Sequence, residues 1–267
     1  MTIGRRGFFA AALAAGAASA QESGPGPKPK EPPAKNARVT KLYRSPDLHP
    51  NGLEATSDGL WISDQVSESV NKVDWKTGKV LRSFATEAHN SSGIAVGAGS
   101  VWIACNGGVS NRRPARPNDR PIAEVLQADP ANGRTIDWHQ MPWVSGIHGI
   151  TYVEQTRSLW ATAPSLNIIV EMNPKDLRIV HILPVKGDRP HGLDWQDGAV
   201  WVVIAGDRML QKLDAKTGKL LESLNVGPQE PDPHGLALHD GALYYCDAGL
   251  TAVSAGSAAG YICRIDF

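Results

Sequence analysis

Short stretches in which apolar and polar residues alternate fill the chain from residue 38 to its end. Such alternation is typical of strands that bury one face, and Gly, Asp and Asn clusters separate the stretches. Pairs such as Asp58-Gly59 and Asp197-Gly198 mark tight hairpin turns, because both residue types tolerate the positive φ that those turns need. The pattern therefore predicts an all-β protein made of short antiparallel strands.

The strand pattern repeats with a period near 40 residues. A polar residue followed by Gly and then Leu or Ile recurs in each repeat, and we call this polar position the slot. The slot residues are Asn51, Ser92, His148, His191 and His234, and the three histidines are 43 residues apart. A period of this length with four strand signals per repeat indicates a β-propeller.

Each repeat begins its second strand with an aromatic residue. These residues are Trp61, Trp102, Trp160, Trp201 and Tyr244, and we expect them to pack between blades. The last repeat supplies three strands before the chain ends, whereas residues 37–43 form a lone strand pattern. We therefore predict a five-bladed β-propeller closed by an N-terminal strand that completes the last blade, which removes two exposed edges.

The N-terminus has a different composition. Arg5 and Arg6 precede an apolar run that ends in small residues near Ala20, which resembles a twin-arginine export signal. An ordinary secretory signal or a short anchor is the alternative. Residues 21–37 are rich in proline and read as a linker. The predicted organisation is a signal peptide over 1–20, a linker over 21–37 and the propeller over 38–267, in a periplasmic or secreted protein.

Composition narrows the classes of partner. The chain is 42% apolar and 20% charged with a formal net charge of zero, so it can bury a large core and shows no basic excess for nucleic acid. We expect a monomer that binds a small-molecule substrate, with no nucleic acid and no membrane after signal removal. Cys246 and Cys263 fall in one repeat and are candidates for a disulfide, while small buried thiols are the alternative.

Strand direction places the slot residues on one face of the propeller, together with every loop between the second and third strands. Two of these loops are long, at residues 106–121 and 247–260. The first carries Arg112, Arg113 and Arg116, which we expect to hold a substrate carboxylate or phosphate. Asn51 and Ser92 are further candidate substrate contacts, and the small-residue loop over 247–260 is a candidate lid. A solvated charge run and a plain insertion are the alternatives.

Three histidines in one register predict a central site. Neutral imidazoles of His148, His191 and His234 are suitable ligands for a divalent metal of the zinc or magnesium class, with an open position for substrate. Metal-free acid–base chemistry with His234, or a structural role for all three, are the alternatives.

Acidic residues extend the candidate site. Asp64 and Asp247, each three residues past the aromatic, are candidate acids or bases, and capping of their own loops is the alternative. His49 and His89 precede the slot and are weaker candidates for the rim.

These motifs resemble the virginiamycin B (streptogramin) lyase and NHL-type propeller superfamily. The resemblance rests on the slot, on Asp-Gly-x-x-Trp and on Asp-x-x-Thr-Gly-Lys across residues 38–267. It implies a lyase that uses a divalent ion beside a central histidine. The peptidyl-hydroxyglycine amidating lyase is similar in holding its metal with propeller histidines, which His148, His191 and His234 match. A gluconolactonase-like hydrolase would use Asn51, Glu54 and Asp194.

The sequence thus predicts an exported, metal-dependent lyase that acts on a carbonyl-bearing small molecule, or on an ester or lactone, at a central three-histidine site. A non-catalytic propeller that binds a small ligand or protein partner is the first alternative. A lactonase-type hydrolase is the second.

Overall fold

The computed structural model describes residues 31–110, 112–117, 119–248 and 260–266. The described part is built of strands, apart from one turn of 3₁₀-helix at Pro164–Leu166. The predicted signal peptide and most of the predicted lid, residues 249–259, lie outside the described residues. Export therefore stays a prediction, and the described part contains no helix that is both long and apolar enough to span a bilayer.

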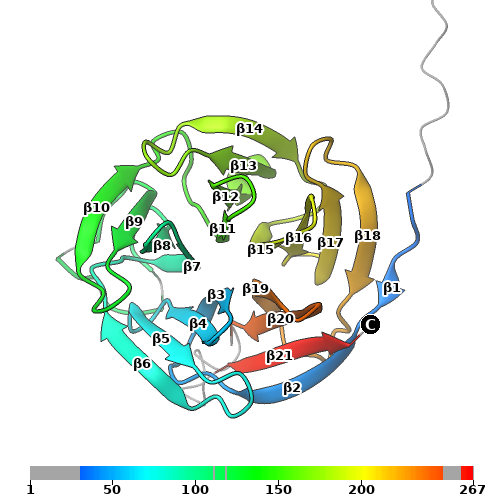
Figure 1. Ribbon diagram of the computed structural model, residues 1–267, viewed down its shortest axis with the longest axis horizontal. Helices are drawn as coiled ribbons and strands as arrows, with labels where there is room; N and C mark the ends of the chain where they lie inside the picture. Colours follow the sequence, from blue (N-terminus) through cyan, green and yellow to red (C-terminus); the bar gives the residue numbers. More distant parts are fainter. Residues whose placement is uncertain (1–30, 111, 118, 249–259, 267) are drawn as a thin grey trace, which may run out of the picture. The chain divides into compact units, whose positions relative to one another are not determined.

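Five antiparallel sheets form the blades of a ring (Figure 1), as the sequence predicted. Blade 1 contains β3 (Pro50–Thr56), β4 (Gly59–Asp64), β5 (Ser69–Val73) and β6 (Val80–Ala85). Blade 2 contains β7 (Ser91–Gly97), β8 (Ser100–Cys105), β9 (Glu124–Ala128) and β10 (Thr135–Gln140). Blade 3 contains β11 (Ile150–Val153), β12 (Ser158–Ala163), β13 (Ile168–Met172) and β14 (Ile179–Pro184). Blade 4 contains β15 (Pro190–Gln196), β16 (Ala199–Ile204), β17 (Met209–Asp214) and β18 (Leu220–Asn225). Blade 5 contains β19 (Pro233–His239), β20 (Ala242–Asp247), β21 (Tyr261–Asp266) and β2 (Arg38–Arg44).

The N-terminal strand closes the ring. β2 pairs antiparallel with β21, so the predicted closure of the last blade is confirmed. The two residues before it, Lys35–Asn36, form β1, which pairs in parallel with β18 at the outer edge of blade 4. The sequence assigned these two residues to the linker. Unlike Pro32 and Pro33 before them, these two residues have a backbone N–H that can donate a hydrogen bond to a neighbouring strand. This end of the linker is therefore able to add to a sheet edge.

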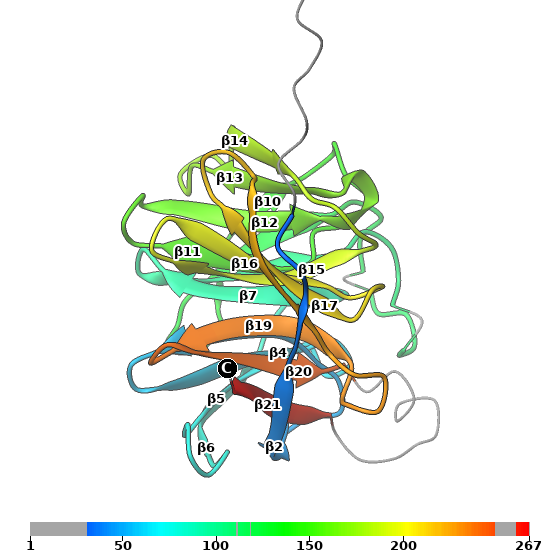
Figure 2. The same cartoon turned by 90° about the vertical axis from the view of Figure 1, so that its right-hand side faces the viewer.

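The innermost strands run through the thickness of the ring. Figure 2 shows β15 and β19 side by side in this orientation, and β3 lies in the same way against β7 and β19. The five slot residues stand at or just before the start of these strands, so they meet on one face of the propeller. We call it the His face.

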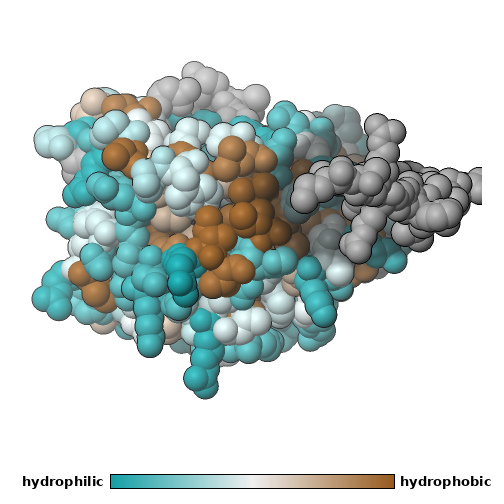
Figure 3. Space-filling view, turned by 90° about the horizontal axis from the view of Figure 1, so that it is seen from above, coloured by the Kyte–Doolittle hydropathy of each residue, from teal (hydrophilic) through white to brown (hydrophobic). Residues whose placement is uncertain are grey.

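The outer strands leave several large apolar side chains exposed. Figure 3 shows a group of hydrophobic residues among hydrophilic ones on one side of the rim. The exposed residues on outer strands are Val80, Leu81, Ile136, Val180, Ile182 and Leu221. Apolar atoms make up much of the accessible surface of folded proteins, so exposed side chains of this kind are ordinary.

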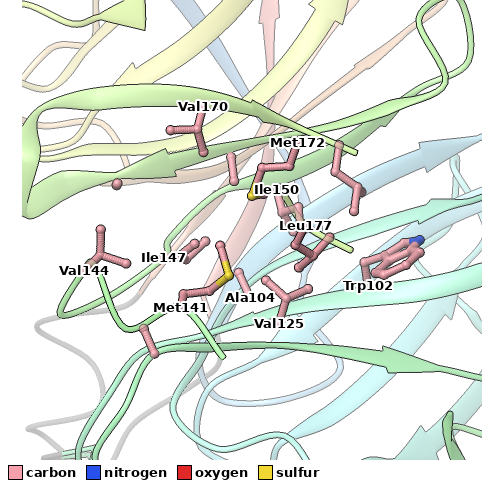
Figure 4. Close-up of a cluster of buried hydrophobic side chains, with 14 of the residues drawn as sticks. Trp102, Ala104, Val125, Met141, Val144, Ile147, Ile150, Val170, Met172 and Leu177 are labelled. Carbon is pink, nitrogen blue, oxygen red and sulfur yellow. The ribbon is translucent and has the colours of Figure 1, made fainter. Parts of the chain in front are cut away.

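The core consists of apolar clusters between neighbouring blades, and each cluster is anchored by the aromatic that begins a second strand. Trp102 of blade 2, which is 1% exposed, belongs to one cluster with Ile150 and Met172 of blade 3 (Figure 4). Leu159 of blade 3 is part of the same cluster. The same arrangement recurs around the ring, with Trp61, Trp160, Trp201 and the partly buried Tyr244. The predicted inter-blade packing is confirmed. All three cysteines are buried free thiols, so Cys246 and Cys263 do not form the candidate disulfide.

The glycine after each slot residue is required by close approach. A Cβ on Gly149 would lie 2.3 Å from the carbonyl oxygen of His191, and one on Gly192 would lie 2.4 Å from that of His234. Gly52, Gly93 and Gly235 face the next innermost strand with similar crowding. The resulting ring of five glycines, which we call the glycine ring, brings the innermost strands together and leaves no room for water between them.

We predict that Gly149→Ala lowers the free energy of unfolding by about 3 kcal/mol or more, because the added methyl group meets backbone and the ring has to expand. Denaturant unfolding measures the change. Gly227→Ala is the matched control, since its Cβ would meet only the Gln229 side chain, at 3.2 Å, and we expect a change within about 0.5 kcal/mol. Equal effects at the two positions would contradict the role of the glycine ring.

Candidate functional site

A cavity of about 430 Å³ opens on the His face, and we call it the His-face pocket. Its lining is polar, with one apolar side chain, Val109. The lining residues are His49, Asn51, Gln65, Asn90, Ser92, Asn106, Val109, Ser110, Arg112, Ser145, Gly146, His148, Arg189, His191 and His234. All five slot residues are among them, so the structure brings the predicted set together.

The three slot histidines form a continuous arc. The ring centroids of His148 and His191 are 4.5 Å apart, and those of His191 and His234 are 4.6 Å apart. His191 and His234 are each 2% exposed. The Nδ1 atoms of His148 and His191 have no hydrogen-bond partner within the described structure.

The neighbours of His234 fix its tautomer. Nε2 lies 3.4 Å from Nη2 of Arg189, and a guanidinium only donates, so Nε2 is the unprotonated acceptor. Nδ1 then carries the hydrogen and donates to the carbonyl oxygen of Asp232 at 3.3 Å. His234 is therefore a neutral imidazole whose basic nitrogen is turned toward a cation.

Burial and positive charge keep the pocket histidines neutral. Burial, followed by the charge of Arg189, lowers the pKa of His148 to about 3 and that of His234 well below its usual range. Burial, followed by the neighbouring His148 and His234, lowers the pKa of His191. Burial and the nearby Arg112 lower the pKa of His49 to about 3.

Two arginines give the pocket its charge. Arg112 comes from the long loop of blade 2, and Arg189 comes from the connection that enters blade 4. Neither is found in an ion pair within the described residues. Burial, followed by the charge of Arg189, lowers the pKa of Arg112. No carboxylate of the described residues lines the pocket, so two cations face the cavity directly. The Asp232 carboxylate lies outside the lining, where it pairs with Arg208 at 2.7 Å and is also within reach of the charge of Arg189.

The other two arginines expected to bind substrate are used inside the protein. Arg113 is 8% exposed and pairs with Glu68 at 3.0 Å and with Asp119. Arg116 donates to the carbonyl oxygen of Val66 at 3.0 Å. Both tie the long loop of blade 2 to blade 1, and neither lines the His-face pocket, so their positions do not support a role in substrate binding.

The two candidate aspartates lie outside the pocket lining. Asp64 is fully buried and accepts hydrogen bonds from the backbone N–H groups of His49, Val66 and Ser67. Through these bonds Asp64 caps its own loop, which the sequence analysis gave as the alternative to a role as acid or base. Asp247 accepts from the backbone N–H of Asp232 at 3.3 Å. Neither position offers a carboxylate to a ligand in the pocket.

The sequence interpretation missed Arg189 and the amides Gln65, Asn90 and Asn106, and it underrated His49. His49 is 1% exposed and lines the pocket with an unpartnered Nδ1. The available signal was topological, since the connections that enter each blade also reach the His face. Arg189 stands directly before Pro190-His191 in such a connection.

The histidine arc fits a metal ion poorly. Within the described residues, no group of three or more His, Cys, Asp or Glu side chains is arranged to hold one. The free nitrogen of His234 already faces the Arg189 guanidinium, whose charge opposes a second cation. A resident divalent metal stays a prediction, and no chemical step below depends on one.

A second polar group lies beyond the glycine ring. Thr151 donates a hydrogen bond toward Glu54 at 3.2 Å or toward Asp194 at 3.3 Å, and both carboxyls are buried. Burial raises the pKa of Asp194 to about 6, and burial together with Asp194 raises that of Glu54. These carboxyls do not line the pocket that contains Asn51, so the trio expected for a lactonase is divided between two places.

Comparisons with known proteins identify the fold. No family model matches the chain, and no curated protein matches it. Among solved structures, the chain is similar to glutaminyl cyclase from Myxococcus xanthus, at 10% identity over 88% of this chain and 99% of that one, with a TM-score of 0.60. It is also similar to a luciferin-regenerating enzyme, at 15% identity over 87% and 96%, with a TM-score of 0.55. A streptogramin B lyase matches at 14% identity over 86% and 98%, with a TM-score of 0.49.

The shared property is the propeller fold. At these identities the likeness says nothing of the reaction. Streptogramin B lyase and virginiamycin B lyase, which the sequence was expected to resemble, are among the similar solved structures. This likeness concerns architecture alone.

We predict that His49 makes the protein acid-sensitive. Its pKa is about 6.5 when unfolded and about 3 when folded, so the unfolded chain binds the extra proton as the pH falls below 6.5. Folding stability from this group is full above pH 6.5 and decreases by about 2 kcal/mol between pH 7 and pH 5.

The variant His49→Gln tests this prediction, because glutamine does not titrate. Denaturant unfolding of both proteins at pH 7 and pH 5 should show a smaller acid loss in the variant, by about 2 kcal/mol. The buried carboxyls change stability in the opposite sense, but they are common to both proteins and cancel in the comparison. An identical acid loss in both proteins would contradict the burial of a neutral His49.

Proposed function

We propose that this propeller is an enzyme that binds a small anionic molecule in the His-face pocket and transfers a proton through His234. The observation that carries the proposal is the pair Arg112 and Arg189, two cations at a cavity whose described lining residues include no carboxylate. Guanidinium groups bind carboxylate and phosphate through paired hydrogen bonds, and they bind more strongly where water is excluded. An anion bearing a carbonyl group would supply a counter-ion inside the cavity.

His234 is the best placed base. Its Nδ1–H is held by the Asp232 carbonyl, and its lone pair at Nε2 points toward Arg189, where the anion would bind. The anion would offset the positive charge of Arg189, and the pKa of His234 would then rise toward the range in which a base is effective. The substrate would thereby activate the base that acts on it.

Lyase chemistry uses this arrangement directly. Nε2 of His234 takes a proton from the carbon next to the carbonyl group, and the C–H electrons move toward the carbonyl oxygen, where Arg189 stabilises the negative charge. The electrons then form a carbon–carbon double bond as the leaving group departs, and the proton on Nε2 is returned to that group. Hydrolysis, in which His234 takes a proton from an attacking water, is the second candidate.

Several of the similar solved propellers are named as enzymes. The similar structures include a glutaminyl cyclase, a luciferin-regenerating enzyme and an aldose sugar dehydrogenase from Streptomyces coelicolor bound to PQQ. These names support the proposal that the propeller is an enzyme. They do not identify its reaction, which we infer from the residues of this chain. A non-catalytic propeller that binds the same anion is the alternative that the experiments below separate.

We predict that the proposed anion site depends on both arginines. Isothermal titration with inorganic phosphate and with succinate should show binding to the full chain, weakened at least about tenfold by Arg189→Gln or Arg112→Gln. Arg178→Gln, an exposed arginine in a turn on the opposite face, is the matched control and should not change the affinity. The affinity should also persist in excess chelator. Loss of binding in chelator would favour a metal, and absence of binding would overturn the anion site.

We predict that His234→Asn removes catalysis while sparing anion binding. In D₂O, proton NMR would follow deuterium exchange next to the carbonyl group of pyruvate, 2-oxobutanoate and 2-oxoglutarate. The wild-type protein should accelerate exchange of at least one of these at least about tenfold over His234→Asn. His181→Asn, on the outer strand β14, should behave as the wild type. Binding of these acids with equal exchange rates in all three proteins would favour the non-catalytic alternative.

A further inference from the structure

We infer that the His-face pocket selects anions that also carry an uncharged hydrogen-bond donor, a hydroxyl or an amide N–H, and that Asn51 and Asn106 accept hydrogen bonds from it. This inference rests on the anion site of the proposed function. It does not depend on the reaction.

The pocket has two chemically different sides. Blades 3 to 5 contribute the histidine arc and Arg189. Blades 1 and 2 contribute neutral amides and hydroxyls instead. These residues are Asn51, Gln65, Asn90, Ser92, Asn106 and Ser110. Arg112 comes from the long loop of blade 2 and is close enough to Arg189 for their charges to interact, so a ligand that fills the cavity meets both cations and uncharged polar groups.

The orientation of the Asn51 amide is fixed by its neighbours. Its Nδ2 lies 3.4 Å from the carbonyl oxygen of Ser91 and 3.2 Å from Oγ of Ser92. A carbonyl oxygen only accepts, so the nitrogen is on that side and Oδ1 points the other way. Asn51 is 4% exposed, and its Oδ1 has no partner within the described structure.

Asn106 repeats this feature at the neighbouring blade. Its Oδ1 is buried without a partner and lies against Gly146, where a Cβ would be 2.5 Å away. Gln65 and Asn90 already bond one another, with Nε2 of Gln65 donating to Oδ1 of Asn90 at 2.6 Å. Two acceptors of the neutral side, Asn51 and Asn106, are therefore without a donor.

Unpartnered buried acceptors favour a ligand that donates. Leaving a buried acceptor without a hydrogen bond is costly, and a donor from the ligand removes that cost. Both oxygens are buried beside the cavity, so a ligand donor reaches them when the amide rotates about the terminal torsion of asparagine, which is broad. At Asn51 this rotation gives up the contacts of Nδ2 with Ser91 and Ser92, which are 3.4 and 3.2 Å long.

The charge of the pocket decides which donor it takes. An ammonium group would also donate, but Arg112 and Arg189 repel it and no carboxylate lines the cavity to pair with it. Hydroxyl and amide N–H groups carry no such penalty. A cavity of about 430 Å³ has the size of a small-molecule site. Small hydroxy acids, hydroxylated phosphate esters and N-acylated acids fit this description.

Matched probes test the preference. Isothermal titration of the full chain would compare glycerol 3-phosphate with propyl phosphate, and 3,4-dihydroxybutyrate with butyrate. We expect each hydroxylated anion to bind at least about tenfold more tightly than its partner. The phosphate and carboxylate pairs show which anion the two arginines prefer.

Substitutions connect the preference to the two amides. Asn106→Leu keeps the size of the side chain and removes its acceptor, so the preference for glycerol 3-phosphate should fall below about threefold while propyl phosphate binds as before. Asn51→Leu is the second variant, in case Asn106→Leu unfolds the loop. Gln140→Leu, on the exposed part of β10, is the control and should keep the full preference.

The outcomes separate the two proposals. Equal affinity for the members of each pair in the wild-type protein overturns the inference and leaves the anion site standing. A preference that survives both Asn106→Leu and Asn51→Leu also overturns it. Absence of binding by all four anions overturns the proposed anion site itself.

Discussion

The close approach of the five innermost strands is the constraint on which the rest of this propeller depends. With five blades the strands converge so tightly that each slot residue must be followed by glycine, because a methyl group at Gly93 or Gly149 would collide with the backbone of the next blade. The same contacts fix the direction of the residue before each glycine. Five polar side chains are thereby directed to one small area, which is why a site forms at the centre.

The glycine ring also separates two environments along one axis. On the His face, burial and two arginines lower the pKa of four histidines, so neutral bases share the pocket with two cations. Beyond the ring, burial raises the pKa of Glu54 and Asp194, and Thr151 bridges them. Glu54 and Asp194 are therefore on the wrong side of the ring to attract a metal to the histidines or to balance the arginines. On the His face, Asp232 lies outside the pocket lining and is shared between Arg189 and its ion-pair partner Arg208.

The fold was predictable because every blade repeats one sequence pattern. The histidine cluster was predictable because the histidines occupy the slot, which is part of that pattern. The arginines were harder, since the long loop has no repeat to align it. Arg112 and Arg113 are adjacent in sequence, yet the first lines the pocket and the second is held by Glu68 and Asp119. The role of Arg189 could not be predicted from the repeat, because the connections that enter the other blades have different residues at that position.

Charge balance links these features to function. A structural consensus would place the same residue in every slot, but blades 1 and 2 have Asn51 and Ser92 where the others have histidine. The division matches the two sides of the pocket, one basic and one neutral with unpartnered acceptors. Bringing Arg112 and Arg189 to a cavity whose described lining includes no carboxylate costs stability, and so does burying acceptors without donors. A single ligand that is anionic at one end and donates hydrogen bonds at the other relieves both costs, so the empty pocket is complementary to its occupant in charge and in hydrogen bonding.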